Sequence, residues 1–202
     1  MSENNEKIYK VVLVGEAGVG KTCIMTRFTK DKFDDEYITS FTAQFLRKTL
    51  EFADGKRITF DIWDTAGQEK YMSINKNLFQ RVQGIILMYD ITEMKSFQNL
   101  SVWMNAVEQL SKGTPLILIG NKIDLKDKRQ VSSEQGKEYA DKYNIEFFES
   151  SGKSGENVEK SFIFLGEEIM RKSNVEEKTG GNDYIISKDS TFNKKKKNKK
   201  CC

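Results

Sequence analysis

The stretch Ile8–Thr22, IYKVVLVGEAGVGKT, decides the fold of this 202-residue chain. Its first half is an apolar run ending at Gly15, which is typical of a buried strand. Its second half fits GxxxxGK[ST], and a helical pattern over 21–30 follows directly. In such a strand–loop–helix, glycines let backbone N–H groups curl around a phosphate, and the helix N-terminus adds its positive dipole end. An ordinary glycine-rich turn is the alternative, but the flanking elements favour a phosphate-binding loop.

Alternating strands and helices continue along the rest of the chain. Continuous apolar runs at 84–90 and 115–121 are typical of parallel strands covered on both faces. An Asp-Gly pair between the runs 44–52 and 57–63 favours an antiparallel hairpin. We expect one more strand, at 146–150, and helices where apolar residues recur with helical spacing, at 96–110, 132–143 and 157–171. The sequence therefore predicts an α/β fold, a six-stranded, mostly parallel sheet with helices on both faces, whose ligands bind at the carboxyl ends of the strands.

Composition changes sharply after residue 172. We expect a flexible N-terminus over 1–6, one folded domain over 7–172 and a disordered basic tail over 173–202. Residues 174–202 hold eight lysines and four acidic residues, so this segment accounts for the net charge of +3 and the rest of the chain is close to neutral.

Other sequence features exclude several classes of protein. No apolar run approaches the roughly 20 residues of a transmembrane helix, and the polar N-terminus has no signal-peptide core, so we expect a cytosolic protein. The chain has three cysteines and no histidine, which excludes a disulfide framework, His-based triads and His-containing zinc sites.

Side chains around the phosphate loop suit phosphates and a magnesium ion. Lys21 would reach the β- and γ-phosphates, and the Thr22 hydroxyl would ligate Mg²⁺. Asp64, at the tip of a strand, is the expected carboxylate on the magnesium side, and Gln68 could orient an attacking water because an amide both donates and accepts. Lys21 and Gln68 are therefore the candidate catalytic residues. The residues expected around the phosphates are Gly15, Ala17, Gly18, Val19, Gly20, Lys21, Thr22, Cys23 and Gly67.

The segment Asn121-Lys122-Ile123-Asp124, at the end of another strand, favours guanine over adenine. Guanine offers two neighbouring donors, N1 and N2, that one carboxylate can accept together, and Asp124 is that carboxylate. Lys122 can lay its stem along the purine, and Asn121 can tie loops together. A helix-capping turn is the alternative for this segment taken alone. After the last strand, Ser151-Gly152-Lys153 completes the expected base site, with the Gly152 N–H facing the guanine O6.

With these motifs in this order, the chain resembles the Ras-like small GTPases over 7–172, and within them the Rab family. WDTAGQE at 63–69, KYMSI at 70–74 and GIILMYDIT at 84–92 are similar to Rab rather than to Ras, Rho or Arf sequences. The resemblance implies a P-loop NTPase fold and a switch: Mg²⁺-GTP orders two loops that partners read, and hydrolysis releases them. It also implies a monomer that acts in vesicle trafficking with an exchange factor, an activating protein, an escort or dissociation-inhibitor protein, and effectors.

The resemblance further implies roles for residues near the two switch loops. Phe33 would edge the guanine, and Tyr37 would close over the phosphates. A partner-facing triad would consist of Phe45, Trp63 and Leu78, of which the last is usually aromatic in the family, so effector choice should differ from that of common Rabs.

Three further positions depart from the family pattern. Ser40 stands where a Thr usually completes the Mg²⁺ coordination, although Thr39 or Thr42 could compete for that role. Gly152 stands where Ala is usual, which keeps the N–H but loosens the loop. Ala17 places a methyl near the space that Gln68 and an incoming arginine finger need, so we expect slow intrinsic hydrolysis that depends on an activating protein.

The chain ends in Cys201-Cys202 behind six lysines between 194 and 200. Double geranylgeranylation of these cysteines is implied by the Rab resemblance, and two lipids hold a protein stably where one does so only marginally. A nuclear-import-like basic tail is the alternative. Nucleic-acid binding is a less favoured role for these lysines, because they lack interleaved aromatic residues. We therefore expect the cytoplasmic face of intracellular membranes, with cycling through the cytosol.

Two other functions stay open at the level of sequence. The same fold could serve as a GTP-dependent binding module that scarcely hydrolyses, an idea that Ala17 and the altered first switch favour and an intact Gln68 disfavours. An ATP-using kinase or ATPase on the same loop is disfavoured by Asp124.

Overall fold

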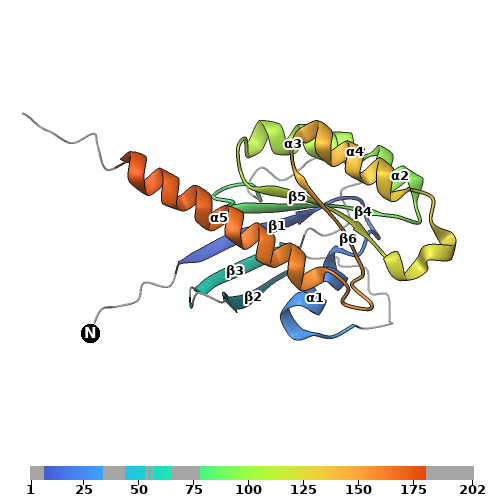
Figure 1. Ribbon diagram of the computed structural model, residues 1–202, viewed down its shortest axis with the longest axis horizontal. Coiled ribbons are helices and arrows are strands. Elements are labelled where there is room, and N and C mark those ends of the chain that lie inside the picture. The colour runs from blue at the N-terminus through green and yellow to red at the C-terminus, as the bar shows by residue number, and fades with distance from the viewer. Residues whose placement is uncertain (1–6, 34–43, 53–54, 56, 65–77, 181–202) are drawn as a thin grey trace, which may run out of the picture.

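The computed structural model describes residues 7–33, 44–52, 55, 57–64 and 78–180. Six strands form one sheet in the order β2-β3-β1-β4-β5-β6 (Figure 1). Only the pairing of β2 with β3 is antiparallel among these strands, which confirms the predicted mostly parallel sheet. The strands are β1 (Ile8–Val14), β2 (Gln44–Glu51), β3 (Arg57–Asp64), β4 (Gly84–Asp90), β5 (Leu116–Asn121) and β6 (Glu146–Ser150).

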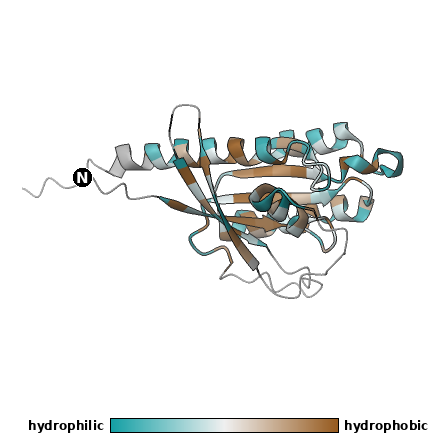
Figure 2. Cartoon of the chain, turned by 90° about the horizontal axis from the view of Figure 1, so that it is seen from below, coloured by the Kyte–Doolittle hydropathy of each residue, from teal (hydrophilic) through white to brown (hydrophobic). Residues whose placement is uncertain are grey.

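Helices cover both faces of the sheet. Helices α1 (Lys21–Lys30) and α5 (Val158–Gly180) lie on one face, and α2 (Met94–Gln98), α3 (Leu100–Leu110) and α4 (Ser133–Tyr143) lie on the other (Figure 1). Alternate residues of β1 supply the two cores: Leu13 packs with α1 and α5, whereas Val12 packs with α3 and α4. The strands are predominantly hydrophobic and the helices carry hydrophilic outer faces (Figure 2), as expected for a sheet buried on both sides.

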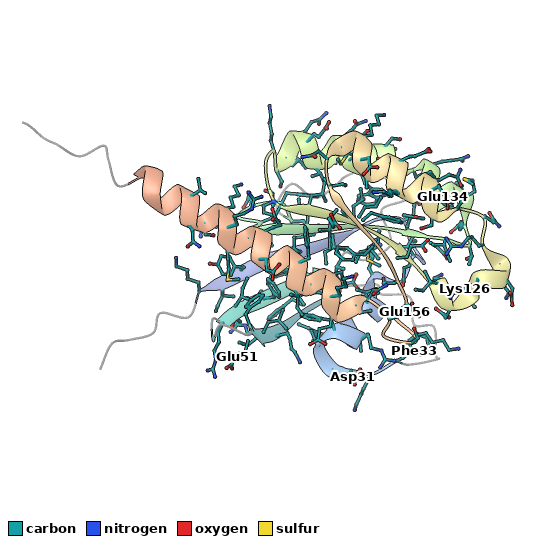
Figure 3. The ribbon with its side chains drawn as sticks, in the orientation of Figure 1. Asp31, Phe33, Glu51, Lys126, Glu134 and Glu156 are labelled. Carbon is teal, nitrogen blue, oxygen red and sulfur yellow. The ribbon has the colours of Figure 1, made fainter. Side chains whose placement is uncertain are left out.

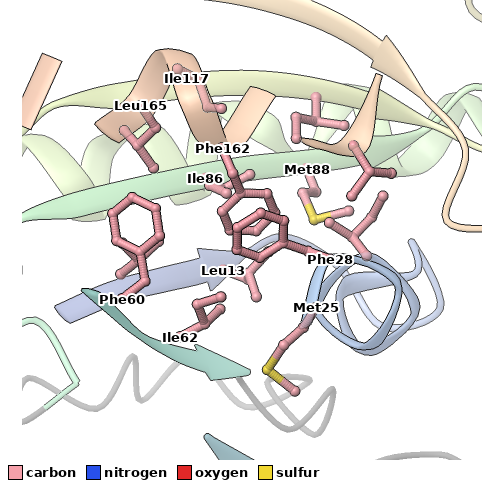
Figure 4. Close-up of a cluster of buried hydrophobic side chains, with 14 of the residues drawn as sticks. Leu13, Met25, Phe28, Phe60, Ile62, Ile86, Met88, Ile117, Phe162 and Leu165 are labelled. Atoms are coloured by element: carbon pink, nitrogen blue, oxygen red, sulfur yellow. The ribbon is translucent and has the colours of Figure 1, made fainter. Parts of the chain in front are cut away.

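Aromatic packing joins α1 to α5 on the first face. The rings of Phe28 and Phe162 stack with centroids 3.8 Å apart and planes within 4° (Figure 4). Phe60 of β3 lies beside this pair, with its centroid 6.4 Å from Phe28. Burying aromatic side chains of this size contributes roughly 1.5–3 kcal/mol each, so this cluster holds the C-terminal half of α1 firmly against the sheet.

The structure corrects three features of the predicted secondary structure. The predicted helix 96–110 is two helices, because Asn99 between α2 and α3 has a ψ of −5°. A 3-10 helix, η2 (Ile123–Lys128), follows β5 and was missed, since six residues with a kink at Leu125 are too few to show helical periodicity. The third correction concerns the C-terminal end of the folded part.

The prediction that the last helix ends at Arg171 was wrong, because α5 continues to Gly180. Residues 173–180, SNVEEKTG, contain Glu and Lys, which favour helix, and no proline, and the helix ends at a glycine. Their low apolar content indicated a tail, yet a helix already anchored by buried Phe162, Leu165 and Ile169 extends through polar residues at little cost. Among the described residues, no helix is both long enough and apolar enough to cross a membrane.

Candidate functional site

The phosphate loop begins where β1 ends and closes at the first turn of α1. Gly15, Gly18 and Gly20 all have positive φ, of 144°, 81° and 94°. A Cβ on Gly15 would lie 2.3 Å from the carbonyl oxygen of Met88, and a Cβ on Gly20 would lie 2.3 Å from the Asn121 side-chain nitrogen. Backbone conformation and close packing therefore both require glycine at the two fixed positions of the motif.

Three side chains meet on the inner side of this loop. The Lys21 ammonium, 5 % exposed, donates to the carbonyls of Gly15 at 2.7 Å and Glu16 at 2.9 Å. The Thr22 hydroxyl donates to Asp64 Oδ2 at 2.5 Å, although these residues lie on different elements. The structure thus brings together the lysine and two of the predicted magnesium ligands.

Asn121, at the end of β5, joins the phosphate loop to the loop after β6. Its side-chain nitrogen donates to the carbonyl of Val19 at 2.8 Å, and its Oδ1 accepts the Gly152 N–H at 3.2 Å. The side chain is 2 % exposed, so both bonds lie in a buried setting where an unmade hydrogen bond is costly. Asn121 therefore ties the loops together, as predicted, and the Gly152 N–H predicted to face the base is engaged by this side chain.

Asp124, in the first turn of η2, is an exposed residue held from one side. Its Oδ1 accepts the Ser151 hydroxyl at 2.6 Å. The Ser151 oxygen in turn accepts the backbone N–H groups of Lys153 at 3.1 Å and Ser154 at 3.0 Å. This chain of bonds fixes the direction of a carboxylate that solvent can reach, which suits an acceptor for an incoming ligand.

The remaining predicted base-site residues line the same end of the sheet. The Lys153 ammonium lies 5.8 Å from the centre of the Phe33 ring, a cation–π distance. Figure 3 labels Phe33 just beyond α1, on the side of the loop that carries Glu156. A Cβ on Gly152 would lie 3.0 Å from the Cβ of Cys23. The absent methyl thus lets the loop pack closely on α1, in contrast to the expected loosening.

The whole chain was also compared with known proteins. The Ras family model matches residues 10–171. The chain is 39 % identical to the Ras-related protein Rab-13 of Rattus norvegicus over 100 % of its own length and 98 % of the relative's. It is 42 % identical to human Ras-related protein Rab-8B over 86 % of this chain and 84 % of that one, and 39 % identical to GTP-binding protein ypt2 of Schizosaccharomyces pombe over 100 % and 99 %.

The chain belongs to the Rab family of Ras-like small GTPases. As a Rab it binds GTP and GDP, hydrolyses GTP and acts as a switch in vesicle trafficking, with regulators and effectors of the kinds that the family uses. Membership in this family also supports the hydrolysing switch over the alternative of a binding module.

In this Rab, two residues of the triad predicted to face partners form an aromatic stack. The ring of Phe45, 52 % exposed, stacks on Trp63 with centroids 5.2 Å apart. The Lys10 ammonium lies 5.2 Å from the Trp63 ring centre, and burial lowers the pKa of that lysine. Leu78 and Trp63 are both half-buried against the same core cluster, so the three predicted residues lie in one region.

Several predicted site residues lie outside the described residues, and for them the expectations stand as they were. They are Tyr37, Ser40, Gly67, Gln68, Cys201 and Cys202.

Two ion pairs next to the predicted base site include charged residues that the sequence did not reveal: Asp90, Arg129 and Glu149. Asp90, 4 % exposed at the end of β4, pairs with the Lys122 ammonium at 2.6 Å. Arg129 forms a two-pronged pair with Glu149, at 2.5 and 3.1 Å, one residue before the buried Ser150, and this hydrogen bonding raises the pKa of Arg129. No local pattern marks these residues, because their partners lie 20 or more positions away in the chain.

Proposed function

We propose that the side chains at the carboxyl end of the sheet form one Mg²⁺-GTP site whose two halves Asn121 connects. The observation that carries the proposal is the pair of Asn121 bonds, one to the phosphate loop and one to the loop after β6. A phosphate loop alone binds many nucleotides, but one fixed rigidly to an oriented Asp124 favours a nucleotide whose base presents two neighbouring donors. Guanine does so, and adenine does not.

On the phosphate side, Lys21 would exchange its two carbonyl acceptors for the β- and γ-phosphates, while the backbone N–H groups of residues 15–23 surround the β-phosphate. The oxygens of Thr22 and Asp64 fit a magnesium ion: they are hard ligands, already 2.5 Å apart, and Mg²⁺ is usually held by one or two carboxylates together with substrate phosphates. Ser40 would add a third protein ligand. When bound, the ion would neutralise charge on the phosphates.

For hydrolysis, we assign Gln68 the role of orienting the attacking water and Lys21 that of stabilising charge on the transferred phosphoryl group. Ala17 is an exposed residue of the phosphate loop. Its methyl supports slow intrinsic hydrolysis that an activating protein accelerates. A single-turnover measurement in which Ala17→Gly releases phosphate no faster than wild type would contradict the steric part of this assignment.

The tail supplies the membrane anchor in this proposal. Prenyl groups on Cys201 and Cys202, together with the six lysines at 194–200, would hold the protein on the cytoplasmic face of an intracellular membrane. A tagged chain lacking Cys201-Cys202 should then be diffuse in the cytosol. Retention of that shortened chain on membranes would contradict the anchor.

The nucleotide site is tested by competition of GTP and ATP for the full chain loaded with a fluorescent GDP. We expect GTP to compete at concentrations lower than ATP by orders of magnitude, and chelation of Mg²⁺ to speed GDP release by about tenfold or more. Thr22→Ala should abolish the response to the chelator. Thr29→Ala is the matched control, because Thr29 lies on the same helix and donates to Met25 at 2.8 Å. Preference for ATP would overturn the proposal.

A further inference from the structure

Arg27, near the C-terminal end of α1, reaches from the helix to the loop after β6. Its Nε donates to the carbonyl of Gly152 at 3.1 Å and one terminal nitrogen donates to the carbonyl of Lys153 at 2.6 Å. The side chain is 17 % exposed. A guanidinium that donates to two successive carbonyls fixes both the position and the tilt of the peptide between them, because its donors form a rigid fork.

The peptide that Arg27 holds is connected to the base-reading carboxylate by three further bonds. The N–H groups of Lys153 and Ser154 donate to the Ser151 hydroxyl oxygen. That hydroxyl donates to Asp124 Oδ1 at 2.6 Å. A shift of the peptide between Gly152 and Lys153 therefore moves Ser151, and with it the direction of Asp124.

The remaining donors of Arg27 face the C-terminal end of its own helix. The other terminal nitrogen donates to the backbone carbonyl of Asp31 at 3.1 Å and to its Oδ1 at 3.0 Å. Phe33 follows two residues later and lies under the Lys153 ammonium. Arg27 thus connects the two walls of the base site, the loop after β6 on one side and the segment after α1 on the other.

We propose that Arg27 is a positioning residue that holds the base-binding loop, and thereby sets both the lifetime of bound GDP and the preference for guanine. The inference rests on the proposed function of the site and deepens it. Arg27 acts without touching a nucleotide atom, through the peptide after Gly152, then Ser151, then Asp124.

The test compares release of GDP with release of inosine diphosphate, which lacks the 2-amino group that Asp124 reads. Loss of the two charge-assisted bonds in Arg27→Ala should speed GDP release by about tenfold or more. The ratio of the two release rates should also move toward one, since a misdirected Asp124 gains less from the amino group. Arg27→Lys keeps the charge but loses the fork, so it should show the same two changes to a smaller degree.

Two variants complete the comparison. Asp31→Ala removes only the exposed side-chain partner and should change GDP release by less than about threefold. Arg57→Ala, which breaks an exposed pair with Glu51 at 2.9 Å on the far hairpin, should leave both release rates unchanged. Thermal unfolding with GDP bound checks each variant for folding, and if Arg27→Ala does not fold, Arg27→Lys decides.

If the Arg27 variants release both nucleotides faster at an unchanged ratio, Arg27 only stabilises the fold and the inference is overturned. Unchanged release rates overturn it as well. If the wild-type chain binds neither nucleotide, the proposed function itself fails.

Discussion

The two halves of the proposed nucleotide site are built differently. On the base side, Asn121 and Arg27 hold the loops through hydrogen bonds to backbone atoms. The Ser151 hydroxyl orients Asp124 by donating to its Oδ1. On the phosphate side, Lys21 donates to a backbone carbonyl that a phosphate would replace. Thr22 and Asp64 bond to each other, and a magnesium ion would replace that bond. In the proposed site, the Ser151 bond that orients Asp124 can persist when a base binds, whereas the phosphate side would have to exchange its partners. In a switch, this difference lets one half retain the nucleotide while the other half responds to its phosphates.

Asp124→Ala should affect the two halves of the proposed site most unequally. It removes the acceptor for both guanine donors and leaves the phosphate side intact. Because two bonds to a charged group are lost, GTP affinity should fall by about a thousandfold. ATP affinity should barely change, so the ratio of the two affinities falls toward one in a competition assay. Asp127→Ala, an exposed carboxylate in the same 3-10 helix, is the control. An equal loss of GTP and ATP binding would show that the two halves are not separate.

Asn121→Ala cuts the connection between the halves. The Val19 carbonyl and the Gly152 N–H each lose their hydrogen bond to the buried Asn121 side chain. We expect the GDP-bound protein to lose about 2–4 kcal/mol of stability, seen as a melting temperature lower by roughly 5–15 °C. Asn105→Ala, on the exposed face of α3, should have no comparable effect. A melting temperature unchanged by Asn121→Ala would mean that the halves are held together by other contacts.

The smallest expected effect comes from restoring the family's usual methyl with Gly152→Ala. Its Cβ would lie 3.0 Å from Cys23 Cβ and 3.2 Å from the Ile24 nitrogen, so the loop or α1 must shift by a few tenths of an ångström. We expect a loss of about 1 kcal/mol and GDP release a few times faster, measured by thermal unfolding and by fluorescent GDP. Slower release would show instead that the glycine does loosen the loop.

The sequence was informative where one short stretch carries the whole signal. The spacing of Gly15 and Gly20 predicted a phosphate loop, and both residues have the positive φ that favours glycine there. Asn121 was correctly expected to tie loops together. The support behind the site was invisible for a physical reason. Arg27 lies on α1 and its two carbonyl acceptors on the loop after β6 lie 125 and 126 residues away, so its role there arises only when the chain folds.

The C-terminal helix shows the opposite kind of error. Residues 173–180 were assigned to the tail on composition, yet composition reports the absence of a core, not the absence of a helix. A helix can outlast its hydrophobic face when its first turns are anchored by residues such as Phe162 and Leu165.

The extension of α5 beyond its hydrophobic part determines where force on the C-terminus acts. The eight residues from Ser173 to Gly180 add about 12 Å of helix, at 1.5 Å per residue, beyond the point where the domain was expected to end. In Figure 1, α5 runs out past the edge of the sheet. The chain after residue 180 is thus attached to the far end of α5. A force on the C-terminus would act through α5 on Phe162 and on its stacked partner Phe28. Phe28 lies on α1, the helix that follows the phosphate loop.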